Sequence, residues 1–331
     1  MADAKEGAIC RGNVAPVYLD SHARWCRGGD GRCRGVAEPA HPLRRSVSGR
    51  RINRRGRTVV GDYLSRTFGQ QIVVENKSGA NGNVGIEYAA KNPPDGYTVL
   101  IATDAVSSNP HVYKMSFDPL QELVAVIELS HQPIALAAHP SLGVTTLAEL
   151  TALAKKQPGL RFATGSGVGL LQAIVVLWYA SLTGITLEQV PYRGGGPAIN
   201  DLIAGHVKLG SLGTTPLLPH YTVGTLYLLA QSMAARSPAL PNVPTFQEAG
   251  ISGLVVDQRI GVFVPKGTSP AIAQRLNGEI NAALRDDKVR KSFADQAQEP
   301  AGGTAEQYAR LVREDSEKYG RLVKELNVKV E

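Results

Sequence analysis

Cysteine is scarce in this chain of 331 residues, and it is absent after position 33. The three cysteines are Cys10, Cys26 and Cys33, separated by 15 and 6 residues. These spacings fit no usual zinc-binding pattern, and an odd number of cysteines cannot pair completely into disulfides. The body of the chain therefore has no cysteine nucleophile, and its composition suits an exported protein.

Long apolar runs and catalytic signatures are also missing. No stretch approaches the roughly 18 apolar residues that a membrane-spanning helix needs. The chain contains no Gly-x-Ser-x-Gly elbow, no Walker loop and no His-Glu-x-x-His motif. These absences remove the most recognisable enzyme classes and favour a protein that binds without catalysing a reaction.

Positive charge is confined to one end of the chain. The formal net charge is +7, but residues 1–57 hold 13 of the 36 Lys and Arg residues and only 5 of the 29 Asp and Glu residues. Residues 58–331 therefore carry 23 basic and 24 acidic residues. A nucleic-acid partner is not expected, because such binding needs basic charge on a folded face.

Residues 1–57 do not resemble the rest of the sequence. They show no sustained helix or strand period and no apolar core of a secretory signal. They are rich in Arg, Gly, Ala and Cys, which is the composition that a GC-rich gene yields when it is translated out of frame. One hypothesis is a frame-shifted or mis-started product up to about residue 56. The alternative is a disordered basic arm, and the upstream DNA in three frames distinguishes the two.

After a helix expected at 58–68, the sequence predicts a β-α-β unit. An apolar strand at 72–74 leads into a Gly/Asn/Ser loop at 76–82, a helix at 83–91 and a second strand at 97–102. A strand, crossover helix and strand of this length indicate a parallel sheet.

Further strand-to-loop joints follow, and all are rich in Gly, Ser and Thr. A strand at 160–164 precedes a glycine loop that opens a long helix, and a strand at 187–190 precedes a helix with Pro197 at its first position. A strand at 207–212 ends in the loop 213–216. Helix amino ends offer unpaired N–H groups that suit an anion. The glycine spacing only partly matches a dinucleotide loop, so a nucleotide-dependent α/β enzyme stays the alternative.

The chain is long enough for two domains. Apolar runs at 123–127 and 134–138 flank a short hinge at 130–133, and a strand at 255–264 returns. Three amphipathic helices finish the chain. We therefore expect one lobe from 58–130 with 256–331, and a second lobe from 131–255.

Five ordered motifs show a family resemblance. They are VVENKSGANGNVGIEYAAKNPPDGYTVLIAT, SSNPHVYKMSFDPLQEL, VPYRGGGPAINDLIAGHV, RSPALPNVPTFQEAG and GVFVPKGTSPAIAQRLN. From about Val59 to Glu331 the chain resembles the Bug-type (TctC-like) solute-binding receptors of tripartite tricarboxylate transporters.

The resemblance implies an α/β fold, namely a two-lobed type II periplasmic-binding-protein fold in which each lobe is a mostly parallel sheet flanked by helices. It also implies a monomeric periplasmic receptor that is not an enzyme and needs no cofactor or metal. Its ligand would be a small carboxylate: a tricarboxylate, a dicarboxylate, an amino acid or an aromatic acid. Its protein partners would be the membrane permease subunits of the transporter.

The resemblance further implies which residues hold the ligand. They follow the lobe strands or lie near the return crossing, and they are Thr103, Asp104, Ala105, Val106, Thr164, Gly165, Ser166, Gly167, Val168, Arg193, Gly194, Gly195, Gly196, Gly213, Thr214, Thr215, Gln258 and Arg259. The loop at 76–82 is expected to support the fold rather than to hold the ligand.

The chain departs from the family pattern at three places. The family's first strand and its Pro-Phe-x-x-Gly-Gly loop should fall at about 43–53, where the chain reads LRRSVSGRRIN, so we expect the first strand to be missing. Family members often carry a Thr/Ser-rich loop that contains a histidine, and this chain has Val-Gly-Leu-Leu-Gln at the corresponding residues 168–172. An Asp is common in the family after the strand at 207–212, and Gly210-Ser211-Leu212 stands there in this chain. These changes predict a less polar or singly charged ligand, and a non-functional receptor remnant is a third interpretation.

Overall fold

The computed structural model describes residues 45–48, 54–77, 79–168 and 170–328, all within one compact unit, Ala40–Glu331. The hypotheses about residues 1–44 lie outside this range. None of the described helices is both long enough and apolar enough to cross a bilayer.

The described strands form one mixed sheet in the order β2-β1-β3-β9-β4-β7-β5-β6, with β8 and β10 both paired to β4. The pairs at the two ends of this order are parallel, and the pairs that involve β4 or β9 are antiparallel. The strands are β1 Arg45–Ser48, β2 Val73–Asn76, β3 Thr98–Thr103, β4 Leu123–Ala138, β5 Leu160–Thr164, β6 Leu187–Pro191, β7 Leu209–Gly213, β8 Tyr227–Gln231, β9 Asp257–Pro265 and β10 Glu299–Pro300.

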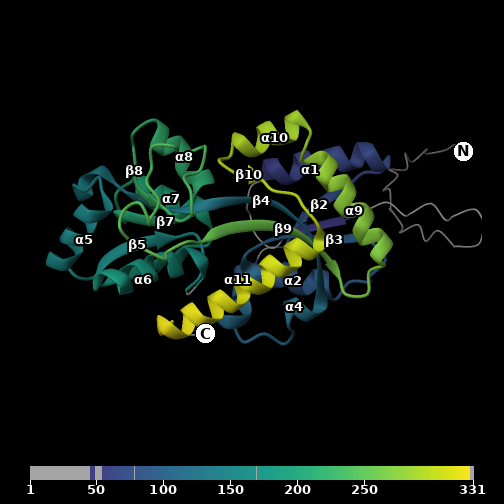
Figure 1. The fold of residues 1–331 in the computed structure, drawn as a ribbon, viewed down its shortest axis with the longest axis horizontal. Coiled ribbons are helices and arrows are strands. Elements are labelled where there is room, and N and C mark those ends of the chain that lie inside the picture. The colour runs from purple at the N-terminus through teal and green to yellow at the C-terminus, as the bar shows by residue number, and fades with distance from the viewer. Residues whose placement is uncertain (1–44, 49–53, 78, 169, 329–331) are drawn as a thin grey trace, which may run out of the picture. The chain divides into compact units, whose positions relative to one another are not determined.

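Helices cover both faces of the sheet (Figure 1). Two of them begin with a capping box, formed by Thr146 and Glu149 at the start of α5 and by Thr304 and Gln307 at the start of α11. The helices are α1 Arg54–Phe68, α2 Asn83–Ala90, α3 Ala105–Ser108, α4 Pro119–Glu122, α5 Leu147–Lys156, α6 Leu171–Thr183, α7 Gly195–Ile203, α8 Thr214–Thr222, α9 Pro270–Ala283, α10 Asp287–Ala294 and α11 Ala305–Glu325.

Strand alternation explains these layers. Successive side chains of a strand point to opposite faces. In β3, Ile101 packs in a core with α1, α9 and α10, whereas Leu100 packs with α2 and α11. In β4, Leu136 packs with α5 and α6, whereas Ala137 packs with α7 and α8. The sheet thus has helical layers on both faces in each half, and the predicted α/β fold class is confirmed.

The two halves are joined through β4 and β9. β4 pairs with β9 from Leu123 to Pro133, and it pairs with β7 and β8 from Ile134 onward. The expectation of two strands separated by a hinge at 130–133 is therefore wrong, because β4 runs unbroken across this point. Pro133, which has no N–H to donate, falls where β4 changes partners, and a proline is tolerated at such a switch.

Other boundaries also differ from the predictions. β1 lies between β2 and β3 and runs parallel to both, so the expectation of a missing first strand is wrong. α6 begins at Leu171 rather than in the glycine loop, and α7 begins at Gly195, two residues before Pro197. α8 was not predicted, because two prolines and three threonines within nine residues gave it no clear helical period.

Candidate binding site

A cavity of about 870 Å³ lies between the two halves of the described unit. Its volume falls within the range of small-molecule sites, roughly 300–1,000 Å³. Its walls come from the loop before α2, the two strands that join the halves, and the loops after β5, β6 and β7. The lining residues are Gly79, Ala80, Asn81, Gly82, Gln132, Gly165, Gly167, Gln172, Pro191, Tyr192, Arg193, Gly194, Gly195, Gly196, Leu212, Gly213, Thr215, Pro216 and Gln258.

Two glutamines connect the crossing strands beside this cavity. The Nε2 of Gln132 on β4 donates to the Oε1 of Gln258 on β9 over 2.8 Å. The Oε1 of Gln132 accepts from the backbone N–H of Thr215 at 3.2 Å and from its hydroxyl at 3.0 Å. Both glutamines are at most 3% exposed. This neutral amide pair therefore fixes the position of β4, β9 and the start of α8 relative to one another.

The amino ends of α7 and α8 open toward the cavity. The N-cap residues are Gly194 and Gly213, neither helix has a side-chain cap, and both glycines line the cavity. The first amides of a helix have no intrahelical acceptor, and the helix dipole makes this end positive. Gly194 has a φ of 117°, which favours glycine and turns the chain sharply into α7. These helix ends can bind an anionic oxygen.

The charge of the cavity wall is concentrated on one side chain. Among the described residues that line the cavity, only Arg193 carries a formal charge, and it is exposed. Its neighbour Tyr192 donates a hydrogen bond of 2.6 Å to the Oδ2 of Asp201. Burial, with the help of this carboxylate, raises the pKa of Tyr192 to about 12, so Tyr192 stays neutral. The wall therefore offers one positive charge, neutral amides and hydroxyls, and some apolar surface.

The structure places half of the predicted site residues in the cavity wall. Those that line it are Gly165, Gly167, Arg193, Gly194, Gly195, Gly196, Gly213, Thr215 and Gln258. Those that do not are Thr103, Asp104, Ala105, Val106, Thr164, Ser166, Val168, Thr214 and Arg259.

The residues outside the wall have other surroundings. Residues 103–106 are buried. Among them, Asp104 lies behind the cavity wall, where its Oδ1 accepts a hydrogen bond from the Nε2 of Gln258 at 3.5 Å. The hydroxyl of Thr164 donates to the carbonyl of Ser166, which is itself buried. The hydroxyl of Thr214 donates to the carbonyl of Ala297 over 3.0 Å.

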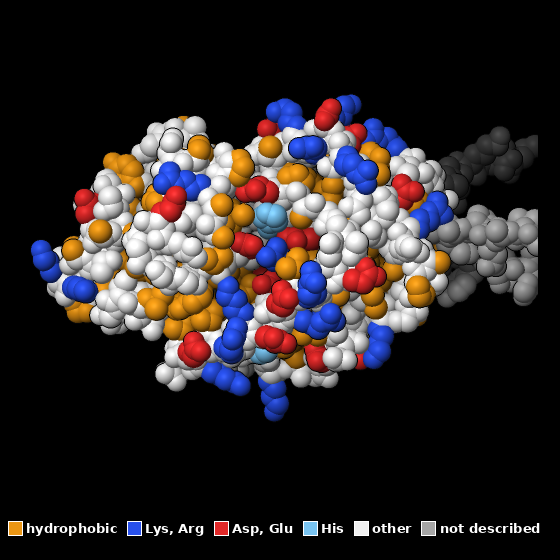
Figure 2. All heavy atoms as spheres, viewed as in Figure 1, with side chains coloured by type: hydrophobic (Ala, Val, Ile, Leu, Met, Phe, Trp, Pro, Cys, Tyr) orange, Lys and Arg blue, Asp and Glu red, His pale blue; other side chains and the backbone are white. Residues whose placement is uncertain are grey.

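Arg259 instead belongs to a partly buried ion-pair network beside the crossing strands. It contacts Glu128 at 3.0 Å, Asp257 at 2.8 Å and Asp315 at 3.2 Å. Burial raises the pKa of Asp315 to about 6 against the attraction of Arg259. Asp315 belongs to α11, and Figure 2 shows acidic and basic side chains interspersed where α11 passes β9. The arginine is fully engaged there, and this explains why it does not reach the cavity.

Sequence reasoning missed part of the wall. It treated residues 79–82 only as support for the fold, but the structure places all four in the wall. It also missed Gln132, Gln172 and Tyr192. The glycine-rich pattern at 79–82 was a usable signal for this loop, whereas an isolated glutamine in a strand gives none.

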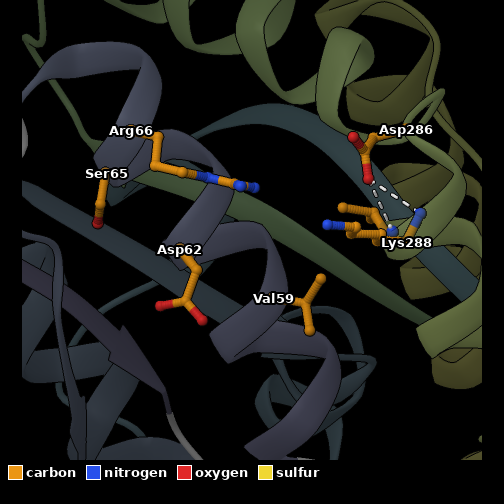
Figure 3. Close-up of a pocket in the computed structure, with 7 residues that line it drawn as sticks. Val59, Asp62, Ser65, Arg66, Asp286 and Lys288 are labelled. Carbon is orange, nitrogen blue, oxygen red and sulfur yellow. Dashed lines mark hydrogen bonds between the residues drawn. The ribbon is translucent and has the colours of Figure 1, made fainter.

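A second hollow, of about 520 Å³, lies between α1 and α10 (Figure 3). Its charged side chains are balanced, with Asp62 and Arg66 on α1 and with Asp286 and Lys288 by α10. The Oδ1 of Asp286 accepts from two backbone amides at the start of α10, as the dashed lines show. This hollow therefore offers an anion no excess of positive charge.

Comparisons with known proteins agree with this architecture. Residues 57–328 match the sequence model of a protein family, the tripartite tricarboxylate transporter family receptor. Protein BugT of Bordetella pertussis is 32% identical over 82% of this chain and 84% of its own length. An R. palustris protein solved with adipate is 29% identical, with a TM-score of 0.80 over 88% of this chain and 99% of that one. The periplasmic binding protein BugD is 25% identical, with a TM-score of 0.80 over 88% of this chain and all of that one.

Proposed function

The chain belongs to the tripartite tricarboxylate transporter receptor family, and from this premise we propose that it is a periplasmic receptor that captures a small carboxylate for a membrane permease. The observation that carries the proposal is the cavity, where two uncapped helix amino ends and Arg193 meet in a wall with no carboxylate among its described residues. The adipate held by the R. palustris relative supports the same ligand class.

The proposed mechanism is capture without chemistry. The helix-end amides at 194–196, the hydroxyl of Thr215 and the amides of Gln132 and Gln258 replace the water around the ligand. Arg193 attracts the carboxylate from the rim. Charge-assisted hydrogen bonds of this kind are about twice as strong as neutral ones. Because the wall has one charge and some apolar surface, the proposed ligand carries one carboxylate in the cavity and a less polar remainder.

We further propose that residues 58–130 with 256–331 form one lobe and that residues 131–255 form the other. The ligand favours the closed arrangement of these lobes as a population shift. The closed form then presents a continuous surface to the permease. The receptor works as a monomer.

The first experiment is a thermal-unfolding screen of the full chain. A ligand that binds only the folded state stabilises by about 2.7 kcal/mol at a concentration one hundred times its dissociation constant. The panel contains citrate, C4-dicarboxylates, adipate, acidic amino acids and aromatic acids. Adipamide, the uncharged analogue of adipate, is the control.

The proposal predicts that at least one acid raises the melting temperature and that its uncharged analogue does not. Stabilisation by NAD(P) with no response to any acid contradicts it and favours a nucleotide-dependent enzyme.

A further inference from the structure

The two halves contact each other directly across the cavity wall through Asn81, Tyr113 and Gly167, a group that we call the clasp. The backbone N–H of Gly167, in the loop after β5, donates to the Oδ1 of Asn81 over 2.9 Å. The Nδ2 of Asn81 donates to the hydroxyl of Tyr113. Asn81 and Gly167 both line the cavity, so this hydrogen bond closes part of its wall.

The first side of the clasp has an unusual backbone. Residues 79–82 all have positive φ angles, and two of them, Ala80 at 42° and Asn81 at 53°, are not glycine. Such conformations are uncommon for residues with a side chain, although Asn adopts them more readily than most, and they concentrate at functional sites. The Nδ2 of Asn109 holds this loop by donating to the carbonyl of Asn81 at 3.2 Å. The strained turn thus directs the amide of Asn81 toward the other half.

The second side of the clasp is held equally firmly. The Nε2 of Gln189 donates to the carbonyl of Gly167 at 3.2 Å, and the Oε1 of Gln172 accepts from the N–H of Gly165 at 2.8 Å. A Cβ on Gly167 would lie 2.2 Å from the Nδ2 of Asn81 and 2.5 Å from the Tyr113 hydroxyl. Position 167 therefore admits only glycine while the clasp is formed.

An apolar cluster lies behind the clasp. Val112, next to Tyr113 in sequence, packs with Leu170, which follows Gly167 by three residues. Ile174 of α6 and Leu322 and Val323 of α11 belong to the same cluster, and all five side chains are at most 6% exposed. The two loops therefore meet through a hydrogen bond at the cavity and through buried apolar surface behind it.

We propose that the clasp holds the two halves in the closed arrangement before ligand arrives, so that Asn81 is a positioning residue for capture. This inference rests on the proposed function, because it assigns a role in capture to the same cavity. When only a fraction of the receptor molecules is in the binding-competent state, the apparent affinity equals the intrinsic affinity multiplied by that fraction. The clasp thus raises affinity by keeping the closed state populated without ligand.

The test measures amide hydrogen exchange in the ligand-free full chain. Asn81→Gly removes the clasp side chain and still tolerates the positive φ. It is predicted to speed exchange of residues 165–168 and Leu170 at least tenfold while β4 stays protected. Asn92→Ala is the matched control, because the Asn92 side chain donates within its own turn, to the carbonyl of Tyr88.

Two more variants make the test specific. Asn81→Asp keeps an acceptor for the Gly167 N–H and should retain the protection. Gly167→Ala should lose it, whereas Gly278→Ala, whose Cβ meets nothing within 4 Å, should not. Unchanged exchange in Asn81→Gly overturns the proposal, and so does equal loss in Asn81→Asp.

These readouts need no ligand, so they separate this inference from the proposed function. A chain that binds no carboxylate can still show the clasp, and a chain without a clasp can still bind. Where a carboxylate has been identified by the thermal screen, Asn81→Gly should raise its dissociation constant about tenfold. An unchanged constant contradicts the role in capture.

Discussion

Arg193 supplies the formal charge of the described cavity wall, and its exposure places it at the rim. Rim charges act mainly on the association rate and its salt dependence. Arg193→Gln is therefore expected to weaken carboxylate binding about threefold to tenfold at low salt and to flatten the dependence of the association rate on salt. Stopped-flow binding measures both quantities, with Arg161→Gln, which changes an exposed side chain of β5, as the control. A variant that binds as fast as the wild type at every salt concentration contradicts the role of Arg193.

His131 gives the protein a pH-dependent stability. Its hydrogen bond of 3.1 Å to Glu128 raises its pKa more than burial lowers it, and Asp257 and Glu299 add to the increase. The folded protein thus holds this proton more tightly than the unfolded chain does. The resulting stabilisation is complete below about pH 6.5 and is lost as the pH rises through the folded-state pKa.

We expect the wild type to lose about 1 kcal/mol of unfolding free energy from this group between pH 6 and pH 8, the scale of a partly exposed charge-assisted hydrogen bond. His131→Gln should remove that part of the slope, and His220→Gln should leave it. Urea unfolding at several pH values measures the difference. The same slope in His131→Gln and in the wild type contradicts this assignment.

Arg259 forms ion pairs with three carboxylates beside the crossing of β4 and β9. Its side chain is 18% exposed, and that of Glu128 is 6% exposed. Removing one partner of a buried pair leaves uncompensated charge and costs about 3–5 kcal/mol. Arg259→Met should therefore destabilise strongly in urea unfolding. Arg161→Met, which removes an exposed pair with Glu188, should cost less than about 1 kcal/mol. Equal effects in the two variants contradict the importance of the network.

At the scale of elements, α11 ties the two halves together. Its early residues Tyr308 and Val312 pack in the core on β3 and β9, whereas Tyr319 packs in the core around α5 and α6. Near its end, Leu322 packs against Leu170 of the second half. One helix thus contributes apolar surface to both halves, so that they support each other's stability.

Leu322→Ala is expected to cost about 2–5 kcal/mol, because the side chain is 4% exposed and its removal leaves a cavity. It should also speed the amide exchange of residues 165–168 and Leu170. Arg321→Ala, one residue earlier on the exposed face, should change unfolding free energy by less than about 0.5 kcal/mol. A small cost for Leu322→Ala contradicts the role of this helix end in joining the halves.

Elements with a clear period could be predicted from sequence. The unit from β2 to β3 was placed to within a few residues, because the apolar pattern and the turn residues agree there. β4 was not recognised as one strand, because Pro133 and the polar residues around it resemble a loop. They remain in a strand because β4 exchanges one set of partners for another at that point. Such an exchange depends on contacts that are distant in sequence.

At the scale of the whole molecule, the cavity is assembled from segments far apart in the chain. Gln132 and Gln258 meet across 126 residues, and Asn81 meets Gly167 across 86. The glycine-rich loops indicated where strands end, which is why the sequence grouped Arg193 with residues 194–196, and the structure places all four in one cavity wall. The glutamines and Asn81 could not be predicted from local pattern, because their role depends on which loops the sheet order brings together.

The central claim, that this cavity captures a small carboxylate, is tested most directly by isothermal titration of the full chain with the acid that raises its melting temperature most. The account predicts one site per chain with a dissociation constant in the micromolar range or below, equivalent to about −8 kcal/mol. The uncharged amide of the same acid should give no binding heat. Absence of binding by every acid in the panel, or equal binding of the acid and its amide, would contradict the claim.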